Sequence, residues 1–172
     1  MKTAKTLITL AAAVGGLVVG GGGSAASASP TPSCKPAQMV VSRGAAQGTA
    51  GTIYYPIIFT NTGGTCTIFG VPHIQPVVGP MHHALGPAAG NASMGEMPAL
   101  HRLARGQSVS VGYGVTESGN FSVASCHPKT ANGILVSLTP FVKSTFVKMT
   151  ISVCTSRVST HSRLLSPGKL GY

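Results

Sequence analysis

The stretch of residues 52–72 places the strongest constraint on how this chain can fold. In its first half, Ile53, Tyr55, Ile57 and Phe59 occupy alternate positions and therefore share one side of an extended chain. This period of two is the pattern of a β-strand with one strongly apolar face. The chain must bury that face against a second layer, so the fold has to be built around this strand.

A chain reversal is expected directly after this strand. Residues 61–65 read Asn-Thr-Gly-Gly-Thr, which are types that tolerate positive φ and favour tight turns. A second strand then starts at Cys66, so the sequence predicts a β-hairpin that a disulfide could fasten. The aromatic residues Tyr54, Tyr55 and Phe69 are expected to pack in the core or between sheets, rather than to form a ligand surface.

The first 28 residues have the pattern of a secretory signal peptide. Two lysines precede an apolar run over residues 7–19, and residues 26–28 read Ala-Ser-Ala, a small-residue cleavage site. The apolar run is too short to span a bilayer and glycines interrupt it, which disfavours a membrane anchor. We therefore expect cleavage after Ala28, no transmembrane segment afterwards, and a secreted or envelope-associated protein.

The remaining chain is expected to form a short linker and one domain. Residues 29–33 are a Pro/Ser-rich linker, and residues 34–172 suit a single domain that buries about 68–70% of its unfolded surface. Strands are expected at residues 38–43, 107–115, 134–138 and 147–153, because apolar residues alternate there. Prolines at 72, 76, 80, 87 and 98 restrict the middle segment to short edge strands, best at 74–78, and residues 86–98 are expected to be a mobile loop. Sustained helical periodicity is absent, so the sequence predicts an all-β sandwich.

Four cysteines are expected to form two structural disulfides: Cys34, Cys66, Cys126 and Cys154. On an exported chain an even number of cysteines favours bridges, and the lack of any Cys-x-x-Cys argues against a thioredoxin-like or zinc-knuckle site. Among three possible connectivities, the sequential one pairs Cys34 with Cys66 and Cys126 with Cys154. Each bridge would close a loop of about 30 residues, worth about 3–4 kcal/mol in the chain-entropy model. This connectivity is favoured and the other two stay open; Cys154 is expected at a strand end or on an outer face.

Charge is scarce and strongly one-sided. The formal net charge is +10 at pH 7, with 12 Lys and Arg residues against 2 acidic residues, Glu96 and Glu117. Such a balance favours acidic partners, here phosphate-rich or otherwise acidic envelope polymers, with an envelope protein as the other possibility. Nucleic acid is excluded as a partner because the chain is expected to be exported and its basic residues are scattered without interleaved aromatics.

An enzyme is disfavoured because the chain has so few carboxylates. A Ser-His triad needs a third group that orients the imidazole, usually Asp or Glu, and paired-carboxylate glycoside hydrolysis would require both acidic residues of the chain. A Cys-His nucleophile needs a free thiol, whereas the cysteines are expected to be bridged. We therefore assign no catalytic residue and no cofactor.

A soft-metal site is the alternative that residue types allow. Thioether and imidazole groups suit copper, and several lie close together in the sequence: His73, Met81, His82, His83, Met94, Met97 and His101. Calcium is disfavoured because the chain contains no Asp. Adjacent histidines on an extended strand point to opposite faces, which weakens a joint site, and Met is a common gap filler. No residue is therefore assigned as a metal ligand.

Several of these stretches resemble a known family, the secreted actinobacterial proteins that carry the domain of unknown function 4232. The resemblance rests on Tyr-Tyr-Pro-Ile-Ile-Phe-Thr-Asn-Thr at 54–62 and Cys-Thr-Ile-Phe-Gly-Val-Pro at 66–72. It extends to Cys34, Val-Gly at 78–79, Leu-Ala-Arg-Gly at 103–106, Gly-Asn-Phe at 119–121, Cys-His-Pro at 126–128 and Cys154. It implies an immunoglobulin-like antiparallel β-sandwich and supplies no active site, since the family's function is not established. This chain departs from the pattern at His73 and in the Met/His-rich loop.

Together these observations lead to two function hypotheses. The first is an exported, non-catalytic immunoglobulin-like domain with two disulfides that binds or organises cell-envelope material. The alternative is an extracytoplasmic copper-binding protein that uses the Met/His-rich loop.

Overall fold

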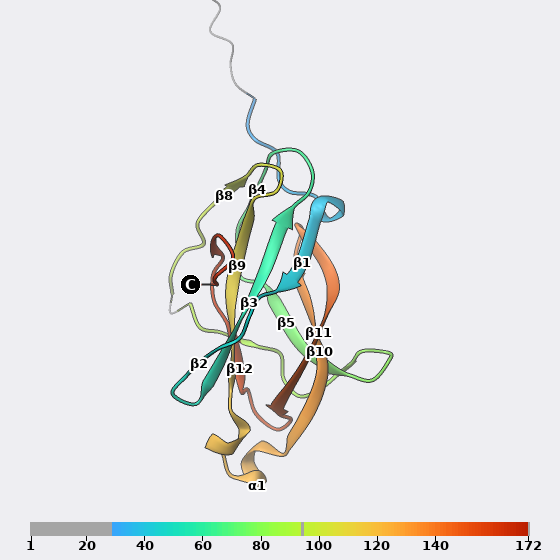
Figure 1. Ribbon diagram of the computed structural model, residues 1–172, viewed down its shortest axis with the longest axis vertical. Helices are drawn as coiled ribbons and strands as arrows, with labels where there is room; N and C mark the ends of the chain where they lie inside the picture. Colours follow the sequence, from blue (N-terminus) through green and yellow to red (C-terminus); the bar gives the residue numbers. More distant parts are fainter. Residues whose placement is uncertain (1–28, 94, 172) are drawn as a thin grey trace, which may run out of the picture.

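A computed structural model describes residues 29–93 and 95–171, so the expected signal peptide lies outside the described residues. The described part is almost entirely β-structure (Figure 1). In chain order its elements are η1 (Pro36–Gln38), β1 (Met39–Arg43), β2 (Gln47–Thr49), β3 (Thr52–Asn61), β4 (Cys66–Ile68), β5 (His73–Val78), β6 (His83–Ala84), β7 (Gly90–Asn91), β8 (His101–Leu103), β9 (Ser108–Thr116), η2 (Ser118–Asn120), α1 (Val123–Cys126), β10 (Pro128–Leu138), β11 (Val142–Cys154), β12 (Thr160–Ser162) and β13 (Ser166–Pro167). No helix in these ranges is long and apolar enough to cross a membrane.

The strands form two main sheets and one small one. The larger sheet has the order β1-β3-β9-β12-β7, with β2 added to β3 and β13 added to β9. The second sheet has the order β11-β10-β5-β6, and β4 pairs only with β8. Pairing within these sheets is antiparallel except between β7 and β12. This arrangement confirms the predicted all-β fold, and it is compatible with an immunoglobulin-like sandwich.

The core lies between the two main sheets. On β3, Ile57 and Phe59 are fully buried, and they stand opposite Val111 and Val109 of β9. Residues from β10 and β11 on the second sheet, such as Ile134, join the same apolar cluster. On these strands, the face that carries the alternating apolar residues is therefore the face that packs in the core.

One core residue carries an unusual polar group. Tyr113 of β9 is fully buried, and its hydroxyl has no hydrogen-bond partner in the described part of the chain. Burial raises the pKa of this phenol far above its ordinary value. The hydroxyl of Thr160 opposes the shift as a nearby dipole, although the two groups do not complete a hydrogen bond.

The predicted hairpin between residues 52–61 and the strand at Cys66 is wrong. Strand β4 pairs with β8, Cys66 standing opposite Leu103. The reason is that both edges of β3 are already occupied, one by β1 and β2 and the other by β9. The chain after β3 therefore has to leave the larger sheet, and it is fastened outside it.

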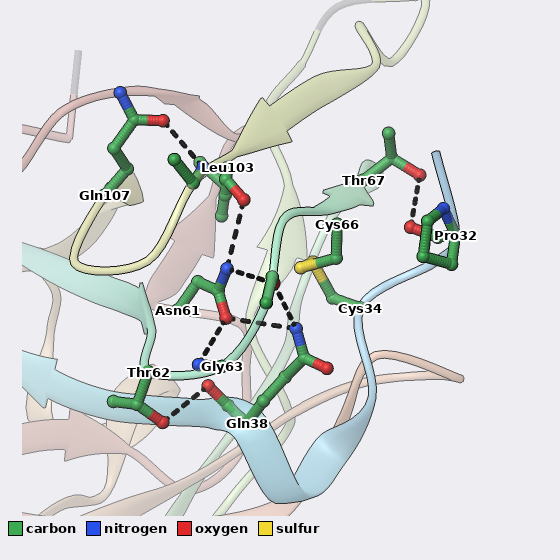
Figure 2. The surroundings of a disulfide bond; sticks show 12 residues. Pro32, Cys34, Gln38, Asn61, Thr62, Gly63, Cys66, Thr67, Leu103 and Gln107 are labelled. Atoms are coloured by element: carbon green, nitrogen blue, oxygen red, sulfur yellow. Dashed lines mark hydrogen bonds between the residues drawn. A yellow bond between two sulfur atoms is a disulfide. The ribbon is translucent and has the colours of Figure 1, made fainter. Parts of the chain in front are cut away.

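Asn61 holds the turn at which the chain leaves the sheet (Figure 2). Its side chain is fully buried, and its amide donates hydrogen bonds to the carbonyls of Gly64 at 2.8 Å and Leu103 at 3.0 Å. Its Oδ1 accepts from the backbone N–H of Gly63 at 2.9 Å and from Gln38 Nε2 at 3.0 Å. One amide thereby ties together the end of β3, the following turn, η1 and β8.

Three further expectations about local structure need correction. Strand β5 was expected at an edge, but it lies between β10 and β6, and the Pro76 carbonyl accepts from Leu85 N–H. The segment 86–98, expected as a mobile loop, is partly fastened, because β7 pairs with β12 and the N–H of Ala92 donates to Ser162. In the expected linker 29–33, the Pro32 carbonyl accepts from the N–H of Thr67 at 2.8 Å, so the linker extends the small β4 region.

Candidate functional site

The outer face of the larger sheet carries a strip of small residues along β9. The sequence places Ser108, Ser110, Gly112 and Gly114 on the side opposite the core, where solvent exposure is the usual outcome for a sandwich strand. All four are nevertheless buried. Something therefore covers this face, and the covering groups define the candidate site.

An aromatic pair covers the end of the strip at Gly114. Tyr54 of β3 and His161 of β12 both stand opposite Gly114 in register, one on each side. The two rings meet edge to face with centroids 5.5 Å apart, and Tyr54 Oη lies 3.4 Å from His161 Nε2. A Cβ at position 114 would collide with the imidazole, so only glycine lets this ring come so close to the sheet.

The imidazole of His161 is held in its neutral form. Partial burial lowers its pKa below the ordinary value of 6.5, and the positive charge of Arg163 lowers it further. At neutral pH the cation of this region is therefore the guanidinium of Arg163, which is exposed.

The C-terminal segment covers the next part of the strip. Strand β13 pairs with β9, and the chain then turns over the sheet so that Gly171 lies on Gly112. The N–H of Gly171 donates to Ser110 Oγ at 2.9 Å. A Cβ at position 112 would come within 2.6 Å of the Gly171 carbonyl oxygen, so this close approach also requires a glycine.

These groups surround a pocket of about 170 Å³, which we call the outer pocket. Its lining comes from the β2–β3 hairpin, the glycine floor of β9 and the C-terminal segment: Gln47, Thr49, Tyr54, Pro56, Gly112, Arg163, Leu170 and Gly171. It combines an aromatic ring and apolar side chains with one amide, two hydroxyls (of Thr49 and Tyr54) and one guanidinium. These groups can hold a small ligand by stacking, hydrogen bonding and charge, while the lining contains no carboxylate, histidine or thiol that could act as a base or nucleophile.

The sequence reasoning missed this site. Tyr54 and Tyr55 were both expected to be packing residues, and only Tyr55 packs against the core. The signal was present, because Tyr54 falls on the face of β3 opposite to Ile57, and that face meets the glycines of β9. The contribution of His161 and Leu170 could not be read from the sequence, since it depends on where the C-terminal segment crosses the sheet.

The cysteines form the sequential pairing that the sequence favoured. Cys34 is bonded to Cys66, and Cys126 is bonded to Cys154. All four side chains are buried, and the described part of the chain contains no free cysteine. Cys154 is the last residue of β11, as expected for a strand end. The sulfurs are therefore structural and provide no thiolate for catalysis or metal binding.

The Met/His-rich residues are spread over several elements of the described chain. His82 lies at the turn between β5 and β6, where its ring stacks on Phe146 with centroids 4.0 Å apart. His101 is on β8, and its Nε2 is hydrogen-bonded to the Leu165 carbonyl at 3.0 Å. Met81 and Met97 are exposed by 77% and 86% of their surface. Within residues 29–93 and 95–171, no group of three or more His, Cys, Asp or Glu is placed to hold a metal ion.

One histidine contacts a serine in a way that resembles part of a catalytic triad. His127 follows α1 with a positive φ of 46°, and its Nδ1 is hydrogen-bonded to the Ser156 hydroxyl. Both residues are exposed, and the described hydrogen bonds of this imidazole include none to a carboxylate. The pair therefore lacks the third group that would orient the ring and stabilise its charge.

Comparison with known proteins places the chain in a family. No curated protein and no solved structure matches it. The family model described as "Domain of unknown function (DUF4232)" matches residues 34–163, which include both disulfides, the Asn61 turn and most of both sheets. The match covers more than half of the chain, and the protein therefore belongs to the DUF4232 family.

Proposed function

We propose that this protein is an exported, non-catalytic domain that binds acidic material of the cell envelope. The observation that carries the proposal is the charge of the folded surface. The described domain holds ten Lys and Arg residues against Glu96 and Glu117. With only two side-chain carboxylates available, most of these cations have no acidic partner within the domain, so their field is directed at solvent and at acidic polymers.

Other observations support export and binding. Both cysteine pairs are oxidised, as is usual for proteins of oxidising, extracytoplasmic compartments. The His127–Ser156 pair has no hydrogen bond to an orienting carboxylate among the described residues, and the outer pocket has the composition of a binding site. No observation favours the copper alternative specifically, because His82 is engaged in stacking and His101 in a backbone hydrogen bond.

The basic residues nearest to one another in sequence provide the test. Arg102 on β8 and Arg105 in the turn before β9 are both exposed, and Arg102 Nε donates only a long hydrogen bond, 3.4 Å, to Thr31 Oγ1. Neither side chain fills the core, so both can be changed without disturbing the fold. Exposed charge pairs contribute about 1 kcal/mol or less each, so a double change should weaken binding measurably but not abolish it.

The experiment measures cosedimentation of the purified protein with envelope fractions at low and high salt. The screening length falls from about 30 Å at 0.01 M salt to about 3 Å at 1 M. We expect binding to decrease steeply between these conditions, and to decrease further in Arg102→Gln/Arg105→Gln. The pair Lys143→Gln/Lys148→Gln on β11 is the control for net charge alone. Salt-independent binding, or no binding at any salt, would overturn the proposal and favour a specific protein partner.

A further inference from the structure

We infer that the outer pocket binds one anionic sugar unit, a uronate or a sugar phosphate, of an envelope glycan. This inference rests on the proposed function and assigns it a specific site. The long-range attraction of the basic surface brings the glycan to the domain, whereas the outer pocket recognises a single sugar unit of that glycan. The two contributions are carried by different side chains and can be tested separately.

The size of the outer pocket fits a single ring. Its volume is about 170 Å³, and an engineered apolar cavity of about 150 Å³ binds benzene, a single six-membered ring. Pockets for larger ligands of drug size span about 300–1,000 Å³. The occupant is therefore one cyclic unit, and the remainder of the glycan would lie in solvent.

The lining combines apolar and polar groups that suit a pyranose. Tyr54 and Pro56 present an apolar surface, suited to the C–H groups of a sugar ring, and exposed Leu170 adds to it. Gln47 and Thr49 are exposed on the same outer face and supply groups that both donate and accept hydrogen bonds. Sugar hydroxyls also donate and accept, so an amide and a hydroxyl are suitable partners for them.

Arg163 specifies a negative charge on the ligand. Its planar guanidinium can donate two parallel hydrogen bonds to a carboxylate or phosphate. The lining of the outer pocket contains no acidic residue; Glu96 lines an adjoining pocket that shares Arg163 and Gly171 with it, and the neighbouring His161 is kept uncharged. A cationic ligand would be repelled here.

Part of the wall of the outer pocket lies beyond the family match. The family match ends at residue 163, whereas Leu170 and Gly171 lie beyond it. The segment that carries them is fixed by the hydrogen bond from Gly171 to Ser110 and by the contact with Gly112. Anionic sugar binding at this position therefore does not extend automatically to family members that lack such a segment.

The experiment is an NMR titration of the isotope-labelled protein with D-glucuronate, D-glucose 6-phosphate, inorganic phosphate and neutral D-glucose. We expect glucuronate or glucose 6-phosphate to shift the amide signals of Gly112, Gly171 and Thr49, with glucose binding at least tenfold more weakly. The comparison of the two anionic sugars identifies the source of the charge. Shifts with inorganic phosphate alone would show a bare anion site and overturn the sugar assignment.

Two variants test the roles of the lining residues. Arg163→Gln should weaken binding of the anionic sugar at least tenfold, and Arg163→Lys should restore part of it. Tyr54→Ala should weaken all sugars, including glucose. Arg157→Gln is the matched control, since Arg157 is exposed and stacks on Phe121, outside the outer pocket. Equal affinities of Arg163→Gln and the unchanged protein would overturn the inference.

The cosedimentation and titration experiments together distinguish failure of this inference from failure of the proposed function. If the unchanged protein sediments with envelope fractions in a salt-dependent way and none of the sugars shifts the outer-pocket signals, the pocket assignment is wrong and the proposed function stands. If the protein does not bind envelope material at all, the proposed function is wrong as well.

Discussion

Replacing the amide of Asn61 should destabilise the domain more than any other single polar change in the described turn. Asn61→Ala removes four hydrogen bonds of 2.8–3.0 Å. Each of these bonds contributes about 0.5–1.5 kcal/mol to stability, and the buried bond to the Leu103 carbonyl lies at the upper end of that range. We therefore expect the free energy of unfolding to fall by about 3–5 kcal/mol, a large share of the ~5–15 kcal/mol that a domain of this kind possesses.

The assay is urea unfolding followed by circular dichroism, with both disulfides oxidised. Thr62→Ala is the matched control, because Thr62 Oγ1 makes a single exposed hydrogen bond to the Gln38 carbonyl at 3.0 Å. This substitution should lower the free energy of unfolding by about 1 kcal/mol or less. Asn61→Asp keeps the shape but loses both donors, so it should also be strongly destabilised at neutral pH and recover partly in acid, where a protonated carboxyl can donate once. An Asn61→Ala variant no less stable than Thr62→Ala would refute the role given to this amide.

Three further outcomes follow from the same structure and can be measured in the same way. Tyr113→Phe should leave stability unchanged or raise it by about 1 kcal/mol, since it removes a buried hydroxyl that has no partner; a loss above about 1 kcal/mol would show a hidden partner. The pKa of His161 is lowered on folding, so the unfolded chain binds more protons below the ordinary value of 6.5. Stability should therefore be constant above that pH and decline as the pH falls from it towards the lower folded-state value, and His161→Gln should flatten the decline. Gly133→Ala should destabilise the domain by about 1–3 kcal/mol, because the added Cβ would collide with the Phe146 ring and with the Val147 carbonyl oxygen. A Cβ at Gly119 meets free space, so Gly119→Ala should leave the stability unchanged. Equal stabilities of the two glycine variants would contradict the close packing of this strand.

The sequence was most informative where alternation and burial coincide. The inner faces of β3 and β9 follow directly from the apolar residues at every second position, as Ile57 and Val111 illustrate. The pairing of strands was harder to predict, because it depends on which edges are free. A turn sequence at residues 61–65 permits a hairpin but cannot show that β1 and β9 already flank β3. The buried role of Asn61 was concealed for the same reason, since its partners lie on η1 and β8.

The candidate site depended on contacts between distant segments. The glycines of β9 were visible as one face of a strand, but a glycine face alone does not reveal what lies on it. His161 and Gly171 reach this face only because β12 and β13 pair with β9 and the chain then crosses it. The Met/His-rich stretch shows the opposite case: its residues follow one another closely in sequence, but they are distributed over β5, the β5–β6 turn and β8.

The most direct test of the proposed function is binding to envelope fractions whose acidic groups have been blocked. Carboxylates of the fraction are converted to amides and its phosphates are removed, and cosedimentation is compared with that of the untreated fraction at low salt. Binding by charge predicts that the protein sediments with the untreated fraction and is lost from the treated one. Undiminished binding to the fraction without acidic groups would contradict it.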